Sequence, residues 1–415
     1  MEEVKNKTRK SLFYFLLFWV IIRPSLDILS QKEIKISTPF LNFNFNVNIF
    51  LGSWIFLIGF LFLIRNLKVL QSTALFYPII LFLSLSFASI FYSLDSSVSL
   101  REFIRIAGIF LLYFLVYQLM ENKKDWFLLL KIILVSYFLP AVFAVFQLIS
   151  GRGLVDEFGG FYRIYGTFAH PNPFAFYAFF IFGLVFSLLL TKDKELKLWF
   201  KEKDGKIILG ISAVILTFLI LATYSRSALA CFFGFIFIFG IFKYRKLLLA
   251  GFSLFWVIYF SSPVFQERIW ELITLDPYGS VVWRLRFWRD MIPLFFWHPW
   301  FGYGLGVFTK LAEFYRGFKF GSLEAHNDFL KILLENGILG LLAYFWIIIG
   351  LLLCLFKIFI NSQNSQKIFS LGLLGISMAL FGASFFDNIL RVTALQWSFW
   401  VLMAGWLKIN QIKSG

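Results

Sequence analysis

Cysteine and histidine are scarce in this 415-residue chain, which has only two cysteines and three histidines. Both cysteines, Cys231 and Cys354, lie inside long apolar runs, so a disulfide framework is not expected. The histidines form no cluster with them, and the ligand spacing of a zinc site is absent. The sequence therefore predicts a protein that uses no metal and no cofactor.

Charged residues are also few, at 15% of the chain, whereas hydrophobic residues make up 60% and the mean hydropathy is +0.80. Soluble domains carry far more charge. Apolar runs long enough to cross ~30 Å of hydrocarbon recur from Leu12 to Leu407. We interpret residues 1–415 as a single integral membrane domain. The net charge of +16 fits membrane topology and anionic lipid, and we expect no nucleic-acid partner.

No small-residue cleavage site follows the first apolar run, although four basic residues precede it, so we expect a retained first helix. The apolar runs predict an all-α polytopic fold with about twelve transmembrane helices. The expected ranges are 11–29, 47–64, 74–93, 99–120, 126–150, 173–190, 207–223, 228–242, 247–263, 331–356, 368–386 and 393–407.

Short lysine-rich loops predict the orientation of these helices. With a cytoplasmic N-terminus, the inner segments hold 21 of the 39 basic residues, of which 18 are lysines, and the C-terminus is also cytoplasmic. Arginine dominates elsewhere, with 12 of the remaining 18 basic residues, and its planar fork suits phosphate or carboxylate oxygens. This bias favours a bound anion at the outer face. Pairing with outer carboxylates such as Asp276, Asp290 and Glu313 is the alternative.

Two predicted outer segments have informative patterns. Residues 30–46 alternate apolar and polar side chains on either side of Pro39, which is typical of a small β-hairpin. Residues 264–330 form the largest predicted outer loop, between the ninth and tenth helices. This loop contains the sequence FGYGLG at 301–306. These glycines do not open a Rossmann helix, so we interpret them as a tight turn and not as a dinucleotide site.

The segment AHNDFL at 325–330 ends this loop and leads on to Gly337 and Gly340. Asn327 or Asp328 can cap the helix that follows. His326 then lies just before a helix start, where the positive end of the helix dipole disfavours the imidazolium form. A general base needs a neutral imidazole. An interfacial histidine beside an ordinary helix cap is an equally open alternative.

The sequence TYSRSA at 223–228 is a very short turn between two apolar runs, and it holds Arg226 at the outer membrane boundary. We favour an anion-binding role for Arg226, because snorkelling to headgroups does not need so tight a turn. The sequence WRLRFWR at 283–289 is typical of an amphipathic helix on the outer leaflet. Arg284 or Arg286 can join Arg226 at the anion site, and simple attraction to headgroups is the alternative.

Arg101 and Arg105 lie one turn apart at the start of the fourth helix and are further candidates for the anion site. Arg23 and Asp27, also one turn apart, predict a self-contained ion pair. We interpret His170 as structural. The sequence has no outer Asp-x-Asp pair and no phosphate-binding GxxxxGK[ST] loop, which disfavours a metal-dependent sugar transferase and a nucleotide hydrolase.

Taken together, these segments resemble the O-antigen ligase (WaaL) and O-antigen polymerase (Wzy) superfamily of bacterial envelope glycosyltransferases. His326-Asn327 followed by Gly337 and Gly340 is similar to the ligase motif of a histidine, a small polar residue and two spaced glycines. The segments HPWFGYGLG at 298–306, TYSRS at 223–227 and GTFAHPN at 166–172 are similar to other family segments. The resemblance covers residues from about 160 to 345 and implies a GT-C-like helical fold.

The resemblance implies a ligase at the periplasmic face of the bacterial inner membrane. Such a ligase transfers a glycan from undecaprenyl diphosphate to a sugar hydroxyl of lipid A-core, with inversion and without metal, cofactor or nucleotide. Its partners would be the lipid-linked glycan, the lipid A-core acceptor and membrane lipids. Family arginines hold the diphosphate, and these roles would fall on Arg226 and on one of Arg284 or Arg286. His326 would activate the acceptor hydroxyl as a base.

Three alternatives stay open. A polymerase uses the same donor chemistry but extends a second lipid-linked glycan, and only the histidine and its glycine spacing favour the ligase. A protein O-oligosaccharyltransferase would accept a serine or threonine hydroxyl. A lipid or glycan transporter should show inverted repeats and charges near the bilayer midplane, and the sequence shows neither pattern.

Overall fold

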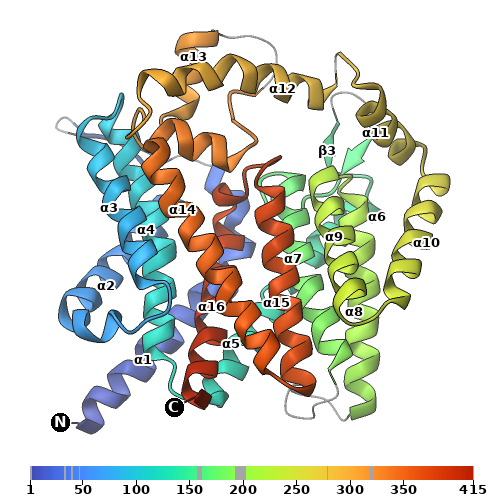
Figure 1. The fold of residues 1–415 in the computed structure, drawn as a ribbon, viewed down its shortest axis with the longest axis horizontal. Helices are drawn as coiled ribbons and strands as arrows, with labels where there is room; N and C mark the ends of the chain where they lie inside the picture. The colour runs from blue at the N-terminus through green and yellow to red at the C-terminus, as the bar shows by residue number, and fades with distance from the viewer. Residues whose placement is uncertain are drawn as a thin grey trace.

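The computed structural model describes residues 2–31, 34–38, 41–45, 47–156, 161–191, 202–277, 279–317 and 322–414, and most of them are helical (Figure 1). The α-helices are α1 Glu2–Ile22, α2 Val47–Leu70, α3 Phe76–Ala88, α4 Ser96–Leu119, α5 Lys123–Val135, α6 Phe138–Ile149, α7 Pro171–Leu190, α8 Glu202–Ala222, α9 Arg226–Phe242, α10 Lys246–Ser261, α11 Pro263–Thr274, α12 Ser280–Met291, α13 Phe308–Arg316, α14 Asp328–Asn361, α15 Asn364–Ala383 and α16 Thr393–Ser414. The 3-10 helices are η1 Arg23–Gln31, η2 Ser89–Phe91, η3 Ile292–Trp297 and η4 Ile389–Arg391.

The chain is an all-α polytopic membrane protein. Seven helices within the described ranges are long and apolar enough to cross a membrane, or eight if α10 and α11, bent by 106°, form one broken span. Three shorter apolar helices add to them, at Phe50–Phe62, Phe76–Phe91 and Arg226–Phe242. Each of the twelve predicted ranges overlaps a helix. The count of twelve crossings stays a prediction.

The helix predicted at 126–150 matches an apolar span at Lys123–Ile149, and this span contains a break. The chain forms α5 and α6 there, with a break at Ser136 and Tyr137. Pro140 explains the break, because proline has no N–H to donate to the carbonyl of Ser136 and its ring clashes with that carbonyl. The Ser136 hydroxyl lies 2.6 Å from the Tyr177 hydroxyl, so a polar contact between α5 and α7 stabilises the break.

Two helices, α4 and α7, form the centre of the bundle because other helices pack around them. The neighbours of α4 include α2, α3 and α16, while α7 contacts α8, α9, α15 and α16. Large aromatic side chains fill the interfaces; Trp400 of α16, for example, packs its ring 5.1 Å from that of Phe110 on α4. Burial of this apolar surface fixes the helices that carry the outer loops.

Two small β-hairpins interrupt the helices. Strands β1 Ile34–Thr38 and β2 Leu41–Phe45 pair in antiparallel fashion with Thr38 opposite Leu41, which confirms the hairpin predicted from the alternating pattern. The turn at Pro39 lies outside the described residues. Strands β3 Leu154–Val155 and β4 Tyr162–Arg163 form a second antiparallel pair between α6 and α7.

Helix α14 is broken at Gly337, where the backbone is left-handed with φ +66°. The turn FGYGLG at 301–306, called the glycine-rich turn below, packs against this break. The amides of Tyr303 and Gly304 donate to the carbonyls of Leu334 and Glu335, both at 2.9 Å, and the amide of Ile338 donates to Pro299 at 2.8 Å. The loop therefore satisfies backbone groups that the helix break leaves without intrahelical partners. Positive φ angles at Gly302, Gly304 and Gly306 confirm the predicted tight turn.

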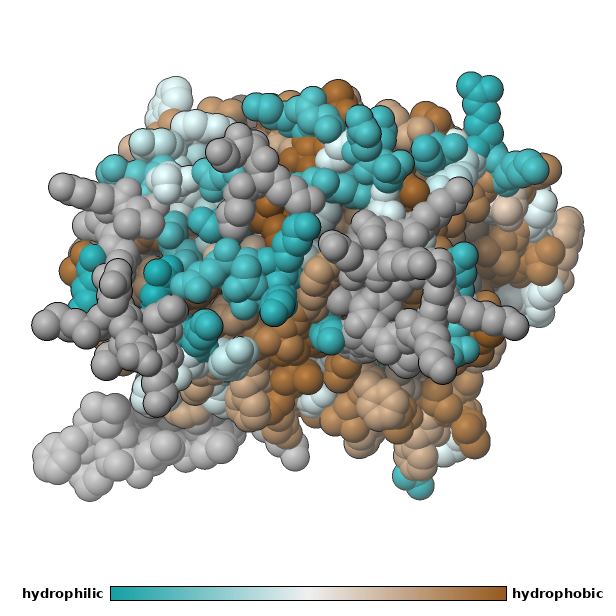
Figure 2. All heavy atoms as spheres, turned by 90° about the horizontal axis from the view of Figure 1, so that it is seen from below, coloured by the Kyte–Doolittle hydropathy of each residue, from teal (hydrophilic) through white to brown (hydrophobic). Residues whose placement is uncertain are grey.

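The two termini lie at one end of the molecule, and α11, α12 and α13 lie at the opposite end (Figure 1). Figure 2 views the end with the termini and shows hydrophilic side chains gathered on it, with hydrophobic ones at its lower and right-hand margins. The helix ends there carry exposed lysines, including Lys123, Lys243 and Lys357. This arrangement fits the predicted orientation, in which the lysine-rich end faces the cytoplasm.

Candidate active site

His326 lies immediately before the start of α14 in a strained backbone conformation. Its φ angle is +45°, in the left-handed region that non-glycine residues rarely adopt. Asn327 caps the helix, because its side-chain oxygen accepts the Leu330 amide at 3.0 Å. The carbonyl of Ala325 accepts from the Trp288 indole at 2.7 Å, and the Trp283 ring packs edge-on against the imidazole. Strain held in place by surrounding contacts is typical of functional positions.

The imidazole of His326 faces Asp387, a residue between α15 and η4. Its Nδ1 atom lies 3.7 Å from Asp387 Oδ1. The other carboxylate oxygen, Oδ2, accepts from the Asn172 side chain at 2.9 Å. Burial alone would raise the pKa of Asp387, but His326 and Arg284 outweigh it and hold that pKa below its ordinary value. The Asp387 carboxylate next to Nδ1 leaves Nε2 of the imidazole for chemistry.

Asp328 connects the start of α14 to the loop that carries Asp387. Its amide donates to the carbonyl of Ser384 at 2.8 Å, and its carboxylate accepts from the amide of Leu390 at 2.9 Å. The two contacts hold both ends of the loop between α15 and α16. Asp328 therefore sets the position of Asp387 relative to His326.

Two arginines on different helices lie near the segment that precedes Asp387, because both line a cavity with Phe386. Arg226 is the first residue of α9, and its Nη1 atom forms a 2.6 Å ion pair with Glu271 of α11. Its Nη2 atom donates to the hydroxyl of Ser280, the first residue of α12. Arg284, one turn further along α12, donates from Nη1 to the carbonyl of Phe386 at 2.8 Å. Its Nε atom is buried without a hydrogen-bond partner.

The two arginine side chains line one cavity of about 430 Å³. Arg226 lies at the start of α9 and Arg284 on α12, near the end of the molecule opposite the termini (Figure 1). The rest of the lining is mostly apolar and comes from α9, α11, α12, α15 and the residues after α15: Ser227, Ala230, Cys231, Leu272, Val281, Leu285, Trp288, Met378, Ala379, Gly382, Ala383 and Phe386. Such a cavity suits a molecule with an anionic group and an apolar chain.

Residues 211–345 match a family model described as O-antigen ligase, and this region contains Arg226, Arg284, His326 and Gly337. The match covers about a third of the chain and supports the O-antigen ligase and polymerase superfamily. Members are glycosyltransferase-like membrane enzymes of ligase or polymerase type, which implies glycan and lipid substrates. No curated protein matches the sequence. The region that matches the O-antigen ligase family ends before Asp387, so that residue enters the site from geometry alone.

The remaining candidate residues lie apart from the cavity. Arg286 is exposed and points away from it, because it is two positions after Arg284 on α12. Arg101 is also exposed. Arg105 is half-buried and forms a bidentate contact with Glu102 at 2.7 and 2.9 Å, so its fork is already occupied.

Two other predicted features are present. Arg23 and Asp27 form the predicted ion pair, with Nη1 3.2 Å from Oδ1. Gly340 lies one turn beyond the break at Gly337, and a side chain there would collide with Asn336.

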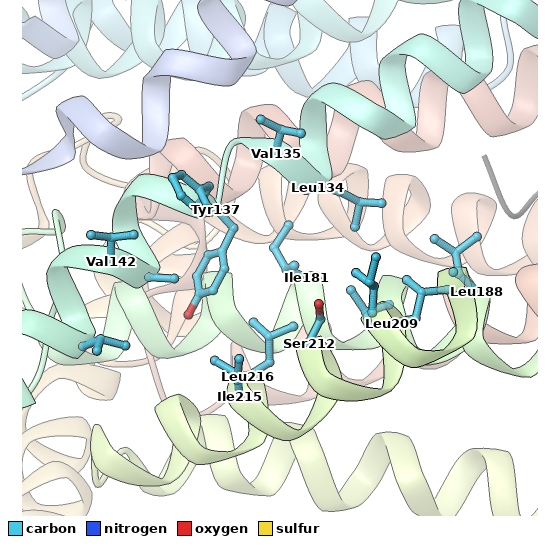
Figure 3. A pocket seen from close by; sticks show the side chains of 16 residues that line it. Leu134, Val135, Tyr137, Val142, Ile181, Leu188, Leu209, Ser212, Ile215 and Leu216 are labelled. Atoms are coloured by element: carbon cyan, nitrogen blue, oxygen red, sulfur yellow. The ribbon is translucent and has the colours of Figure 1, made fainter. Parts of the chain in front are cut away.

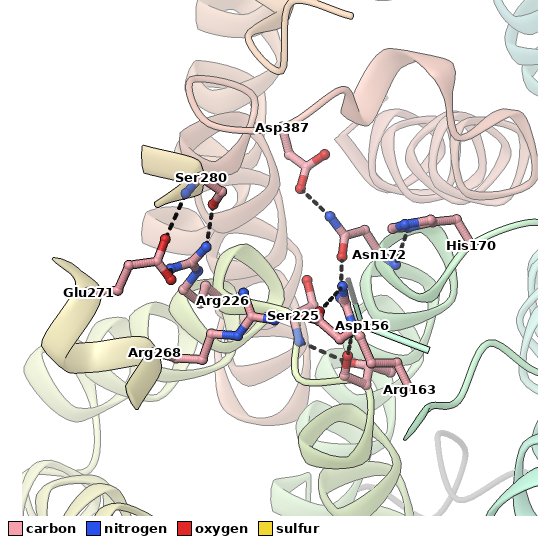
Figure 4. A network of polar contacts seen from close by, with 11 residues as sticks. Asp156, Arg163, His170, Asn172, Ser225, Arg226, Arg268, Glu271, Ser280 and Asp387 are labelled. Carbon is pink, nitrogen blue, oxygen red and sulfur yellow. Dashed lines mark hydrogen bonds and ion pairs between the residues drawn. The ribbon is translucent and has the colours of Figure 1, made fainter. Parts of the chain in front are cut away.

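A network of polar contacts beside Asp387 was not predicted from the sequence (Figure 4). Arg163 donates to Asn172 at 2.9 Å and pairs with Asp156 at 3.4 Å, and Asp156 also pairs with Arg268 at 2.5 Å. Burial and the charge of Arg268 lower the pKa of Arg163 to about 10, which leaves it cationic at neutral pH. Arg268 lies 112 positions from Asp156, and Asp387 lies 215 positions from Asn172, so these contacts leave no local pattern in the sequence. The one available signal was Asp387 itself, the only acidic residue between the last two apolar runs.

His170 belongs to the edge of this network. Its Nδ1 atom accepts the amide of Asn172 at 3.2 Å and so caps α7. Loss of solvent around the ring, together with the charge of Arg163, lowers the pKa of His170 to about 4. The ring is therefore neutral at physiological pH and carries its proton on Nε2, which agrees with the predicted structural role.

A second cavity, of about 530 Å³, lies between α5, α6, α7 and α8 (Figure 3). Its lining is apolar except for Tyr137 and Ser212, and it contains no charged side chain. The absence of charge distinguishes it from the cavity that Arg226 and Arg284 line. The arginine-lined cavity is therefore the better candidate for a lipid-linked anion.

Proposed function

We propose that this protein is an O-antigen ligase, which transfers a glycan from undecaprenyl diphosphate to a sugar hydroxyl of lipid A-core at the periplasmic face of the inner membrane. One observation supports this most strongly. A cavity with two arginines and an apolar lining lies beside a histidine whose Nδ1 atom faces a buried carboxylate. The arginine-lined cavity suits a polyprenyl diphosphate donor, and the histidine–carboxylate pair suits a hydroxyl acceptor.

Donor binding follows from the chemistry of the cavity. The planar forks of Arg226 and Arg284 offer paired N–H donors to phosphate oxygens, and Arg284 has a buried Nε without a partner. The apolar residues of α9 and α15 accept the start of the polyprenyl chain. Fixed cations of this kind neutralise the leaving diphosphate, and the loss of one such contact typically costs ~3 kcal/mol of barrier.

The transfer step uses His326 as the base. The acceptor hydroxyl oxygen attacks the anomeric carbon of the donor sugar and forms the new glycosidic bond with inversion. The bond from that carbon to the phosphate oxygen breaks, and undecaprenyl diphosphate leaves with the electron pair. Nε2 of His326 takes the hydroxyl proton, because Nδ1 faces Asp387. A positioned base of this kind contributes roughly 10²–10⁴-fold.

Reconstitution in vesicles tests the choice of acceptor. The purified protein receives an undecaprenyl diphosphate glycan together with either lipid A-core or a second molecule of the donor. We expect the glycan to appear on lipid A-core. Growth of the lipid-linked glycan instead would make the protein a polymerase, and transfer to neither acceptor would contradict both forms of the proposal.

A His326→Ala variant tests the assignment of the base. Transfer should be lost while donor binding stays nearly intact, because the base does not contact the diphosphate. His298→Ala is the matched control, since His298 is an exposed histidine of the same outer segment and does not line the cavity. A parallel loss of donor binding would make His326 a donor ligand. Retained transfer would remove it from the mechanism.

A further inference from the structure

Glu271 connects three helices at the arginine-lined cavity (Figure 4). It lies near the end of α11, and its side chain is only 17% exposed. Oxygen Oε2 accepts from Nη1 of Arg226 at 2.6 Å, and oxygen Oε1 accepts from the amide of Ser280 at 2.7 Å. One carboxylate therefore joins α11 to the first residue of α9 and to the first residue of α12.

The start of α12 depends on this carboxylate. Its N-cap is Gly279, which offers no side chain to the first amides. Glu271 takes the place of a cap, and a carboxylate is favoured at the positive end of a helix dipole. A side chain at position 279 would approach Oε1 of Glu271 to 2.7 Å, so the close contact requires glycine. Arg284 lies one turn along α12, and its position follows from that of the helix start.

The contacts of Arg226 leave room for an anion. A guanidinium group has five N–H donors. Glu271 and Ser280 each accept one of them, from Nη1 and Nη2. A phosphate oxygen can therefore approach another edge of the same group without displacing the carboxylate. The carboxylate itself cannot swing away without leaving the partly buried amide of Ser280 without this hydrogen bond, which is unfavourable.

We propose that Glu271 is a positioning residue for the donor diphosphate, which holds Arg226 directly and Arg284 through the start of α12. This inference rests on the proposed function, because it takes the ligand of the two arginines to be a diphosphate. It opposes the view that Glu271 is a competing counter-ion that the donor must displace. The two views predict opposite effects of removing the carboxylate.

Measurements of donor affinity distinguish the positioning role of Glu271 from the counter-ion role. The full-length protein in lipid nanodiscs is titrated with undecaprenyl diphosphate that carries no glycan, and in parallel with undecaprenyl monophosphate. In Glu271→Ala, we expect diphosphate affinity to fall by roughly tenfold or more. We also expect a smaller fall for the monophosphate, because the span between two fixed arginines recognises the pair of phosphates. A general packing defect would weaken both lipids equally.

Two further variants complete the test. Glu271→Gln keeps the shape of the side chain and guards against misfolding, but its single carbonyl oxygen cannot serve both Arg226 and Ser280, so it should also lose diphosphate preference. Glu267→Ala removes an exposed acid one turn earlier on α11 and should bind both lipids like the wild type. Unchanged or tighter diphosphate binding by Glu271→Ala or Glu271→Gln overturns the inference, as does an equal loss for both lipids. Failure of the wild-type protein to bind undecaprenyl diphosphate would instead overturn the proposed function.

Discussion

Replacing Gly337 with alanine should disable the enzyme without touching the donor cavity. Gly337 has a φ angle of +66°, and a β-carbon there would lie 2.2 Å from the carbonyl oxygen of Trp300 and 2.5 Å from the amide of Phe301. Both contacts are with backbone, which cannot move aside as a flexible side chain can. The glycine-rich turn and the first part of α14 must therefore separate. His326 moves with that part of α14.

The size of the effect can be worked from these contacts. The conformation of Gly337, with φ +66° and ψ −170°, is essentially restricted to glycine and costs alanine about 1–3 kcal/mol. Separation also breaks the hydrogen bonds from Ile338 to Pro299 and from Leu339 to Trp300, each contributing roughly 0.5–1.5 kcal/mol. The free energy of unfolding should therefore fall by about 2–6 kcal/mol.

Thermal unfolding in detergent, followed by tryptophan fluorescence, measures the loss of stability, and the vesicle assay measures transfer. Gly337→Ala should melt at a lower temperature and lose transfer, while donor binding through Arg226 and Arg284 survives. Gly234→Ala is the matched control, because Gly234 is helical, meets no atom within 4 Å, and should gain about 0.5–1 kcal/mol. A Gly337→Ala protein that melts and transfers like the wild type would refute the reasoning.

Four other outcomes are expected. Arg226→Lys should lose most donor binding, because an ammonium cannot reproduce the planar fork, and near-normal turnover would make Arg226 a lipid anchor. Asp387→Asn should lower kcat by about tenfold or more with donor binding unchanged, since the base loses its orienting charge, and a parallel loss of binding would argue against that role. The depressed pKa of His170 means that the unfolded chain binds a proton between about pH 6.5 and 4 while the folded protein does not. Stability should therefore fall as pH drops through that window, and His170→Asn, which keeps the cap, should flatten the fall; an unchanged slope would contradict this. In a cysteine-free background, Gly317→Cys should react with an impermeant thiol reagent in spheroplasts and Lys357→Cys only after lysis, and the reverse pattern would invert the topology.

The sequence predicted the helices well because apolar runs mark the helices of a membrane protein, and α7 and α9 begin within two residues of their predicted starts. It missed features that apolarity does not encode. The first helix begins at Glu2, well before the predicted residue 11, because polar residues continue the helix beyond the apolar run. The breaks at Ser136 and Gly337 depend on a proline ring and on a distant loop that supplies hydrogen bonds.

The candidate site was predictable only where its residues form local motifs. His326 and Arg226 stood out because each lies at the junction of a loop and a helix. Asp387 and Glu271 were missed, because nothing in their own surroundings reveals partners that are distant in the sequence. The choice between Arg284 and Arg286 needed tertiary structure, since it depends on which face of α12 packs against the loop after α15.

The origin of Asp387 has a consequence for biosynthesis. During translation, Arg226, Arg284 and His326 are synthesised before the loop between α15 and α16. Until that loop arrives, the imidazole has no carboxylate opposite Nδ1, and the amide of Asp328 has no Ser384 carbonyl to bind. Nascent chains that stop before α15 also lack the α15 residues that line the cavity. We therefore expect such chains to bind the donor weakly and to transfer no glycan. Helices α15 and α16 therefore complete the candidate site, and we expect transfer only after both have been inserted.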